Sequence, residues 1–429
     1  MKAKKTTLIV ILVLSLISFL SFSTASAQWS EQTSPLTSPL YSVSAVDNNV
    51  AWSCGTLAKV IKTVNGGTTW TDASGTGILT GLDLYNIFGI DANNALVTGS
   101  SSSTYVYKTT NGGTTWTLVY TQAGGFQNAI WMTSATNGFM TGDPVGGNWA
   151  LYNTVNGGTN WTAVTPAVPG PGIAGWNNSL MILGSKIWFG TNGTKVMYSA
   201  DGGATWSSQT TTGALNTYAV WFNDANNGIA GGSTTGGVKT VNGGTAWSPL
   251  IVSPLLNNNW TGITGYGSNW WISSFTNVIW KSTNGGTSWV ADYTAAVGHQ
   301  YYHMSKARTG NDIYAIKGAG APGQITKYTA STGINLISGE VPSDYSLSQN
   351  YPNPFNPTTN IKFSIPTQGF VTLKVFNSLG KEVATLVNEN TSVGTHEVNF
   401  DAGSLTSGVY FYRLQSDNFA ETKRMMLIK

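Results

Sequence analysis

Short apolar runs separated by glycine- and asparagine-rich turns fill most of the sequence after residue 27. Runs such as Lys59–Lys62 and Val106–Lys108 are three or four residues long and carry β-branched or aromatic side chains, as short strands do. The turns between them supply residues that tolerate tight bends. The pattern predicts an all-β chain with many hairpins.

One eight-residue segment recurs six times and sets a period along the chain. The copies span Thr63–Trp70, Thr109–Trp116, Thr154–Trp161, Ser199–Trp206, Thr240–Trp247 and Ser282–Trp289. Their tryptophans are 46, 45, 45, 41 and 42 residues apart. A period of about 40–45 residues suits one four-stranded blade of a β-propeller. We therefore expect each copy to be the hairpin between the third and fourth strands of a blade.

The residues of each copy have distinct structural roles. The third residue, Asn or Asp, caps a tight turn with its side chain, and the following glycines permit a positive φ. The closing tryptophan is expected to bury a large surface between neighbouring blades. These capping residues and tryptophans are Asn65, Trp70, Asn111, Trp116, Asn156, Trp161, Asp201, Trp206, Asn242, Trp247, Asn284 and Trp289.

The number of blades follows from the two ends of the repeat. Trp29 lies 41 residues before Trp70 but has no eight-residue segment of its own. Residues 299–330 contain strand-like runs without a complete copy. A propeller closes best when one blade is shared between both chain ends. We therefore expect a seven-bladed propeller over residues 28–333, with the last blade completed by a strand around Trp29.

The repeated segment resembles the Asp-box, or bacterial neuraminidase repeat, which is written S/T-x-D/N-x-G-x-S/T-W. Such boxes occur in sialidases, some endoglucanases, sortilin-type receptors and photosystem II stability/assembly factor-like proteins. Five of the six boxes carry Asn at the capping position, a variation common in the last group. In all these families the box is structural, so the resemblance implies a propeller and leaves the activity open.

The first 27 residues have the form of an export signal. Lys2, Lys4 and Lys5 precede an apolar run of 15 residues, Leu8–Phe22, and Ala25–Ala27 forms a small-x-small cleavage site. The run is shorter than the roughly 20 residues that span a membrane. We expect a signal peptide over residues 1–27, a mature chain that begins at Gln28, and no membrane span in the mature chain.

A different pattern occupies the C-terminal part of the chain. Six runs with period-two alternation between Asn360 and Ile428 predict a small β-sandwich over residues 347–429, preceded by a linker at 334–346. Its landmarks are Tyr351, Pro352, Asn353, Pro354, Phe355, Gly380, Gly408 and Lys429. This segment resembles the type A C-terminal sorting domain of the type IX secretion system. The resemblance implies that the chain passes through the periplasm of a Gram-negative cell, contacts that secretion machinery and reaches the cell surface or the medium.

Composition and charge exclude several classes of partner. Only 9% of the residues are charged, and three of the 21 basic residues lie in the leader, which leaves 18 basic against 18 acidic residues. A neutral chain without basic runs lacks the charge pattern of a nucleic-acid-binding protein. The single cysteine, Cys54, excludes an internal disulfide and is expected to be a buried thiol.

Residues 28–340 are poor in catalytic groups. Arg308 is their only arginine, so the arginine triad that a sialidase resemblance would imply is missing. A glycosidase of another kind needs two carboxylates about 5–10 Å apart. Most aspartates fall in turns or boxes, which leaves Asp143, in a glycine-rich loop, and Asp83. We expect no catalytic residue, no cofactor and no metal site, since His299 and His303 would lie about 13 Å apart on a strand.

Aromatic residues offer a binding function instead. Trp149, Trp176, Trp260 and Trp270 lie outside the boxes beside Gly or Asn, as loop residues do, and exposed aromatic rings suit sugar rings or a protein partner. Together with Asp143 they form the candidate ligand-binding set. Tryptophans inside apolar runs are expected in the core, and these are Trp131, Trp221 and Trp271.

These observations favour a secreted or surface-anchored, non-enzymatic propeller that binds a protein or a glycan. The alternative is a secreted carbohydrate-active hydrolase of the Asp-box endoglucanase type, which requires two acidic residues that face each other across one mouth of the ring. A third interpretation, an assembly factor for a membrane complex, fits the propeller but not the sorting domain.

Overall fold

The computed structural model describes residues 28–164, 172–211, 216–232, 236–250, 259–319, 324–330, 334–338, 340–391, 393–403, 405–416 and 419–429. The expected signal peptide, residues 1–27, lies outside this set. The described residues form strands and turns, and they contain no helix that is long and apolar enough to cross a membrane. They group into two compact units that divide between Ala330 and Ser331.

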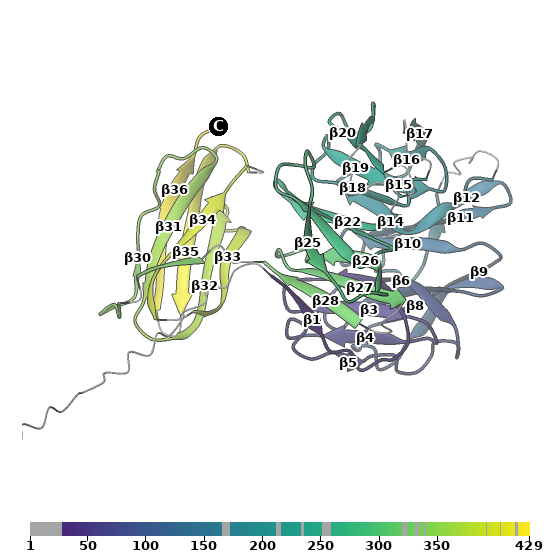
Figure 1. Cartoon of the computed structure of the whole chain (residues 1–429), viewed down its shortest axis with the longest axis horizontal. Coiled ribbons are helices and arrows are strands. Elements are labelled where there is room, and N and C mark those ends of the chain that lie inside the picture. The colour runs from purple at the N-terminus through teal and green to yellow at the C-terminus, as the bar shows by residue number, and fades with distance from the viewer. Residues whose placement is uncertain are drawn as a thin grey trace, which may run out of the picture. The chain divides into compact units, whose positions relative to one another are not determined.

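The first unit consists of four-stranded antiparallel sheets with the form of propeller blades (Figure 1). The described residues form seven such sheets. The first three are β2 (Leu40–Ala45), β3 (Ala51–Gly55), β4 (Val60–Thr63) and β5 (Thr71–Asp72); β6 (Asp83–Gly89), β7 (Ala95–Ser100), β8 (Ser103–Thr109) and β9 (Thr117–Ala123); and β10 (Gln127–Met132), β11 (Gly138–Val145), β12 (Asn148–Thr154) and β13 (Thr162–Ala163). The next three are β14 (Gly175–Leu183), β15 (Lys186–Thr191), β16 (Lys195–Ser199) and β17 (Ser207–Thr210); β18 (Ala219–Phe222), β19 (Gly228–Gly231), β20 (Gly237–Thr240) and β21 (Ser248–Leu250); and β22 (Trp260–Tyr266), β23 (Asn269–Ser274), β24 (Val278–Ser282) and β25 (Val290–Thr294).

The remaining sheet joins the two ends of the unit. It contains β26 (Gln300–Lys306), β27 (Ile313–Ala319), β28 (Gln324–Thr329) and, at its edge, β1 (Gln28–Gln32). The innermost strands β2, β6, β10, β14, β18, β22 and β26 contact one another in this order, and β26 contacts β2 again. The sheets therefore close into a ring, which confirms the expected propeller.

Strand β1 completes the last blade as the position of Trp29 predicts. Trp29 pairs with Tyr328, and Gln32 pairs with Ile325. The indole N–H of Trp29 donates to Asp292 Oδ2 at 2.6 Å, and Trp271 of the neighbouring blade donates to the same oxygen at 2.9 Å. The first strand of the mature chain is thereby tied to the sixth blade as well as to the seventh.

An ion pair with a fully buried lysine also holds β1 in place. The side chain of Lys317 is fully buried, and its Nζ contacts Glu31 Oε2 on β1 at 2.5 Å. Tyr293 and Thr326 donate hydrogen bonds to the other oxygen, Glu31 Oε1, at 2.7 and 3.2 Å. Burial lowers the pKa of Lys317, and the bond with Glu31 opposes this shift.

The boxes adopt the geometry that their residue types predict. In the first box, Asn65 Oδ1 accepts a hydrogen bond from the backbone N–H of Thr69 at 3.0 Å, and Thr63 Oγ1 accepts one from Gly67 at 2.9 Å. Gly66 and Gly67 have φ values of 69° and 83°, which a side chain would make unfavourable. The box tryptophans pack on the preceding blade, as when Trp116 meets Trp52 edge-on at 6.3 Å.

Lysines add a second link between a blade and the box of the next blade. Each lies near the end of the third strand of its own sheet, and its ammonium group donates to the carbonyl oxygen of the first glycine of that box. The pairs are Lys62 to Gly112 at 3.0 Å, Lys239 to Gly285 at 2.6 Å and Lys327 to Gly66 at 2.9 Å. The box turns are therefore part of the contact between blades.

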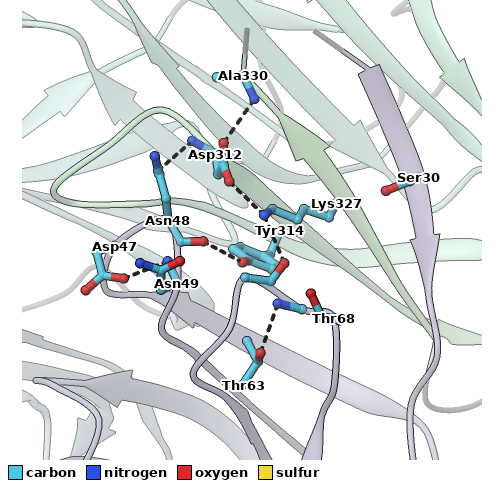
Figure 2. Close-up of polar contacts among 12 residues, drawn as sticks. Ser30, Asp47, Asn48, Asn49, Thr63, Thr68, Asp312, Tyr314, Lys327 and Ala330 are labelled. Atoms are coloured by element: carbon cyan, nitrogen blue, oxygen red, sulfur yellow. Dashed lines mark hydrogen bonds and ion pairs between the residues drawn. The ribbon is translucent and has the colours of Figure 1, made fainter. Parts of the chain in front are cut away.

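Lys327 makes this link between the last blade and the box of the first blade (Figure 2). Its Nζ lies 2.7 Å from Asp312 Oδ2, and both side chains are largely buried. Asp312 Oδ1 accepts a hydrogen bond from the backbone N–H of Ala330, while Asn48 Oδ1 of the first blade accepts one from the backbone N–H of Asp312. Asp312 lies in the connection between β26 and β27, and there it serves as the counter-ion of Lys327.

The second unit is a sandwich of two four-stranded sheets. One sheet has the order β29 (Ile334–Ser338), β34 (Gly394–Asp401), β31 (Thr358–Ile365), β30 (Ser346–Leu347), and the other has the order β33 (Glu382–Thr391), β32 (Gly369–Asn377), β35 (Gly408–Ser416), β36 (Phe419–Leu427). Side chains from both sheets, among them Phe363 and Leu373, share one core. The expected sandwich is confirmed.

Residues 334–346 differ from the expected linker. Residues 334–338 form β29, which pairs antiparallel with β34 from Ile334 opposite Val398 to Ser338 opposite Thr395. The sandwich therefore begins earlier than the alternation of its later strands indicated, because an edge strand needs only a partner with free backbone groups and no alternating pattern of its own.

The landmark residues of the sandwich have mostly structural roles. Phe355 is buried in the core, and Asn353 Oδ1 accepts a hydrogen bond from the backbone N–H of Met426 at 2.9 Å. Lys429 donates from its backbone N–H to Ser407 Oγ and from Nζ to Gly403 O. The Tyr351 side chain is 82% exposed, while its backbone N–H and C=O groups pair with those of Asn360.

The closing ion pair gives a first testable prediction. We expect Glu31→Ala to lower the free energy of unfolding by about 2 kcal/mol, because it leaves the buried Lys317 ammonium without a counter-ion. This value is below that of a fully buried pair because the Glu31 side chain is 41% exposed. Denaturant unfolding of the mature chain measures the change. Adding Lys317→Met should recover most of the loss, and a double variant as unstable as Glu31→Ala would show that the ion pair is not what holds β1.

Candidate functional site: an aromatic mouth of the propeller

One end of the propeller channel is ringed by aromatic side chains. It is the end at which every innermost strand begins, and each blade contributes one half-buried aromatic residue there. Six of them lie within the first three residues of an innermost strand or just before it. The seventh follows β23, which runs antiparallel to β22 and so ends at the level where β22 begins. These residues, which we call the aromatic mouth, are Tyr41, Tyr85, Phe126, Trp176, Tyr218, Phe275 and Tyr302.

The rings of the aromatic mouth contact one another around much of the circle. Five form a continuous row in the order Phe275, Tyr302, Tyr41, Tyr85, Phe126, with centroids 5.0, 5.7, 5.4 and 4.8 Å apart. Trp176 and Tyr218 form a separate stacked pair with centroids 3.8 Å apart. The aromatic surface is therefore shared between blades and depends on the closed ring.

Asp143 lies between the row and the stacked pair. Its Oδ1 accepts hydrogen bonds from Asn128 Nδ2 at 2.9 Å and from the backbone N–H of Gly175 at 2.8 Å. Its own N–H donates to the carbonyl oxygen of Phe126 at 2.7 Å. Asp143 thus connects Phe126 with the residue that precedes Trp176. Burial raises the pKa of the Asp143 carboxyl, and the two accepted hydrogen bonds oppose this shift.

Asp83, the other aspartate that the sequence did not assign to a turn or a box, also lies at the aromatic mouth. It is the first residue of β6, and its Oδ1 accepts a hydrogen bond from the backbone N–H of Leu57 at 3.1 Å. The pKa values of Tyr41 and Tyr85 are raised, first by burial and then by the negative charge of Asp83. No group of three metal-ligating side chains occurs within the described part of the chain.

Asn178 bridges the channel beneath the mouth. The pairing of β14 with β15 shifts register between Gly175 and Leu180, and Asn178 has a φ of 63°, which Asn tolerates better than most residues. Its Oδ1 accepts hydrogen bonds from Ser42 Oγ and Asn86 Nδ2, both at 2.7 Å. Its Nδ2 donates to the carbonyl oxygen of Tyr41 at 3.3 Å. The fourth blade is thereby tied to the first and second blades across the ring.

Several innermost strands donate hydrogen bonds from backbone N–H groups at their inner edges to side chains of the preceding blade. The backbone N–H of Ile87 donates to Ser42 Oγ at 3.2 Å, and that of Ile130 donates to Asn86 Oδ1 at 3.0 Å. Val43 N–H donates to His303 Nδ1 at 3.2 Å, and burial lowers the pKa of this histidine to about 4. These backbone groups are not available to pair with another strand.

The opposite end of the propeller carries the boxes and most of the aspartates. Asp47 and Asp91 each accept hydrogen bonds from two backbone N–H groups of their own turns, as expected. Arg308 also lies there: it donates to Ser44 Oγ and Gly89 O, and burial lowers its pKa to about 10. The charged groups of this end are thus used in contacts within and between blades.

The structure corrects three of the five expected ligand-binding residues. Trp149, Trp260 and Trp270 are 4%, 0% and 3% exposed and belong to the core. Trp260 packs against Gly231 and Gly237, where a Cβ would collide with its ring. Trp149 lines a cavity of about 180 Å³ beside Gln122 and Tyr152 but offers almost no surface to it. A neighbouring Gly or Asn indicated a loop, yet each tryptophan lies on a strand, and glycines make room for the rings of Trp260 and Trp270.

Trp176 and Asp143 are the two expected residues that the structure brings together. The other residues of the aromatic mouth were not expected as site residues, although the sequence contains a signal for them. An aromatic residue recurs near the start of the first strand of a blade, as at Tyr41, Tyr85 and Phe126. The signal is weak because the spacing varies and because buried aromatic residues occupy neighbouring positions, such as Tyr301 beside Tyr302.

Asp143 yields a prediction about pH. Its pKa is raised in the fold above the unfolded value of about 3.9. The stability that Asp143 contributes is therefore present below about pH 4 and is lost as the pH rises through the raised pKa. Asp143→Asn, which keeps an acceptor oxygen for Asn128 and Gly175, should not show this loss. Urea unfolding of both proteins between pH 3 and pH 8 measures the difference.

Asp143→Ala serves as the comparison for the same experiment. It should be less stable at every pH by about 1–3 kcal/mol, because two buried donors lose their acceptor. A difference between the wild type and Asp143→Asn that stays constant with pH would contradict the raised pKa.

Comparisons with known proteins agree with both units. Residues 22–175 match the family model of photosynthesis system II assembly factor YCF48, and residues 349–429 match that of the secretion system C-terminal sorting domain. No curated protein matches the chain.

Solved structures extend the similarity at the level of the fold. A structure described as YCF48 bound to D1 peptide has a TM-score of 0.58 at 18% identity, covering 70% of this chain and 97% of its own. YCF48 from Cyanidioschyzon merolae has a TM-score of 0.54 at 19% identity, with coverages of 70% and 99%. PorZ, described as a surface component of the type IX secretion system of Porphyromonas gingivalis, has a TM-score of 0.51 at 14% identity; the match covers 93% of this chain and 60% of PorZ. The chain therefore joins a β-propeller similar to the YCF48 assembly factors to a type IX secretion C-terminal sorting domain, which directs it to the cell surface or the medium.

Proposed function

We propose that this protein is a non-enzymatic binding propeller, displayed on the cell surface or released, that holds a protein or glycan ligand at the aromatic mouth. The observation that carries the proposal is the gathering of seven half-buried aromatic residues from seven sheets around one end of the channel. Aromatic surface that remains partly accessible in a folded protein is typical of recognition sites. A propeller of the same fold is described as bound to a peptide, which supports binding as the use of this architecture.

The carboxylates at the mouth support binding rather than hydrolysis. Asp143 Oδ1 already accepts two hydrogen bonds, and Asp83 Oδ1 accepts one from the backbone. A general acid–base pair needs one carboxyl that is protonated and a second that is ionised beside it. The contacts of both aspartates are those of residues that hold loops in place.

One observation favours the alternative, a carbohydrate-active hydrolase. The pKa of Asp143 is raised by burial, as that of a general acid would be, and Asp83 lies at the same mouth. The release of reducing ends from polysaccharides by the mature chain tests this alternative. We expect none, and a hydrolysis that Asp143→Asn abolishes would overturn the non-enzymatic function.

The proposed binding function predicts that a substitution at the aromatic mouth lowers the affinity for the ligand. The mature chain is tested against immobilised neutral, acidic and amino oligosaccharides and against a display library of short peptides. For any probe that binds, Trp176→Ala should weaken binding about tenfold or more, because an aromatic anchor is lost from the contact. Val241→Ala, an exposed apolar residue in a box at the opposite end, is the matched control and should change nothing. Equal binding by Trp176→Ala and the wild type would contradict a ligand site at the mouth.

The sorting domain predicts the route of the protein. The propeller and the sandwich have separate cores, so removal of residues 331–429 should leave a folded propeller. We expect this shortened chain to accumulate in the periplasm, as measured by cell fractionation and protease accessibility. The control is residues 331–429 fused to a periplasmic reporter, which should move to the surface or the medium. Normal surface delivery of the shortened chain would refute the assignment.

A further inference from the structure

We infer that the ligand of the aromatic mouth is a neutral oligosaccharide, held by the hydroxyl groups of Tyr302, Tyr41 and Tyr85 together with the carboxylates of Asp83 and Asp143. The inference rests on the proposed binding function and specifies its ligand. It follows from three features of the mouth: hydroxyl and carboxylate oxygens without a partner in the described structure, carboxylates without an ion pair there, and backbone N–H groups that are already hydrogen-bonded.

The three tyrosines present their edges rather than their faces. Tyr302, Tyr41 and Tyr85 stack in sequence, with centroids 5.7 and 5.4 Å apart and interplanar angles of 24° and 7°. The faces between them are covered by one another. A ligand therefore meets a row of ring edges and phenol hydroxyl groups.

These hydroxyl groups have no hydrogen-bond partner within the described structure, and none of them is a buried unpaired atom. Several tyrosines elsewhere in the propeller use their hydroxyl groups internally. Tyr301 OH pairs with Thr326 Oγ1 at 3.1 Å, and Tyr293 OH donates to Glu31 at 2.7 Å. A phenol hydroxyl both donates and accepts, so a row of three free ones matches a ligand that itself carries rows of hydroxyl groups.

The carboxylates add free acceptors at the same mouth. Both Asp83 and Asp143 use Oδ1 in hydrogen bonds to the protein, and neither uses Oδ2 within the described residues. A carboxylate oxygen accepts strong hydrogen bonds from hydroxyl donors. The mouth can therefore accept hydrogen bonds from sugar hydroxyl groups as well as donate to them.

The charge of the mouth excludes an anionic ligand. Neither Asp83 nor Asp143 forms an ion pair with a lysine or arginine of the described chain. An acidic sugar or a phosphate would place its charge beside two carboxylates that no lysine or arginine of the described chain pairs with, which is unfavourable. A neutral ligand meets no such penalty.

The hydrogen bonds at the inner edges of the innermost strands argue against a peptide ligand that adds to a sheet as a further strand. Recognition of an extended peptide by strand addition needs free backbone N–H and C=O groups along a sheet edge. In the first three blades, several of these N–H groups already donate to side chains of the preceding blade, as Ile87 does to Ser42 and Ile130 to Asn86. Recognition at the mouth must therefore use side-chain hydroxyl groups, carboxylates and rings.

Apolar surface at both ends of the tyrosine row completes the match. Phe126 continues the row beyond Tyr85, and Phe275 continues it beyond Tyr302. The Trp176–Tyr218 pair follows beyond Asp143. A sugar ring combines apolar C–H faces with polar edges, and sites for such ligands pair aromatic rings with a few fixed polar groups. The aromatic mouth provides both kinds of group within one circle.

The test removes the hydroxyl groups and keeps the rings. The mature chain and the variant Tyr41→Phe/Tyr85→Phe/Tyr302→Phe are applied to arrays of neutral, acidic and amino oligosaccharides, and affinities are measured by calorimetry for each probe that binds. We expect the wild type to bind neutral oligosaccharides and the triple variant to bind them about tenfold or more weakly, because several hydrogen bonds are lost. The control is Tyr198→Phe/Tyr351→Phe, which removes hydroxyl groups away from the mouth and should bind like the wild type. Unfolding curves confirm that all variants are folded.

The outcomes separate this inference from the proposed function. If only peptides bind and Trp176→Ala weakens their binding, the proposed binding function stands and the inference of an oligosaccharide ligand is wrong. Preferential binding of acidic sugars, or equal binding of neutral sugars by the triple variant, also overturns the inference. If no probe binding depends on the mouth, both proposals fail.

Discussion

Each blade of this propeller has two apolar faces, and both are buried only when the ring is closed. Strand β1 closes it by pairing with β28 from the other end of the unit. Trp29 reaches Asp292 of the sixth blade, and Glu31 meets the buried Lys317 of the seventh. An open ring would expose a sheet edge and the apolar face of a blade to water. The rest of the unit depends on this contact because the described residues of the blades form no helix and the single cysteine can form no internal disulfide.

The two ends of the channel use the same repeat in different ways. At one end, boxes and aspartate turns satisfy their own backbone groups, and lysines such as Lys62 and Lys239 reach the next box. At the other end, the aromatic mouth leaves three tyrosine hydroxyl groups and two carboxylate oxygens without partners among the residues that the structure describes. Polar groups that folding does not use are available to a ligand, so the physical difference between the two ends supports a binding site at the mouth.

Asn178 shows how the ring and the mouth are connected. It adopts a left-handed conformation within a bulge and links the fourth blade to Ser42 and Asn86 of the first two blades. The position of Tyr41 at the mouth is thereby coupled to a blade that is not its neighbour. The sandwich, in contrast, has its own core and carries the sorting function, so binding and export are assigned to separate units.

The sequence by itself determined the features that depend on local residue types and on a period. The boxes, the propeller, the strand at Trp29 and the alternating strands of the sandwich all follow from turn chemistry, φ preferences and repeat length, which act over a few residues. Only the tertiary structure decided which residues share a surface. Trp260 and Trp270 look like loop residues in the sequence, yet the folded sheets bury them, since glycines of the same and of the neighbouring blade provide the space. Tyr41, Tyr85 and Tyr302 are up to 261 residues apart in the chain, and they form one row only because the closed ring brings the start of every innermost strand to the same end of the channel.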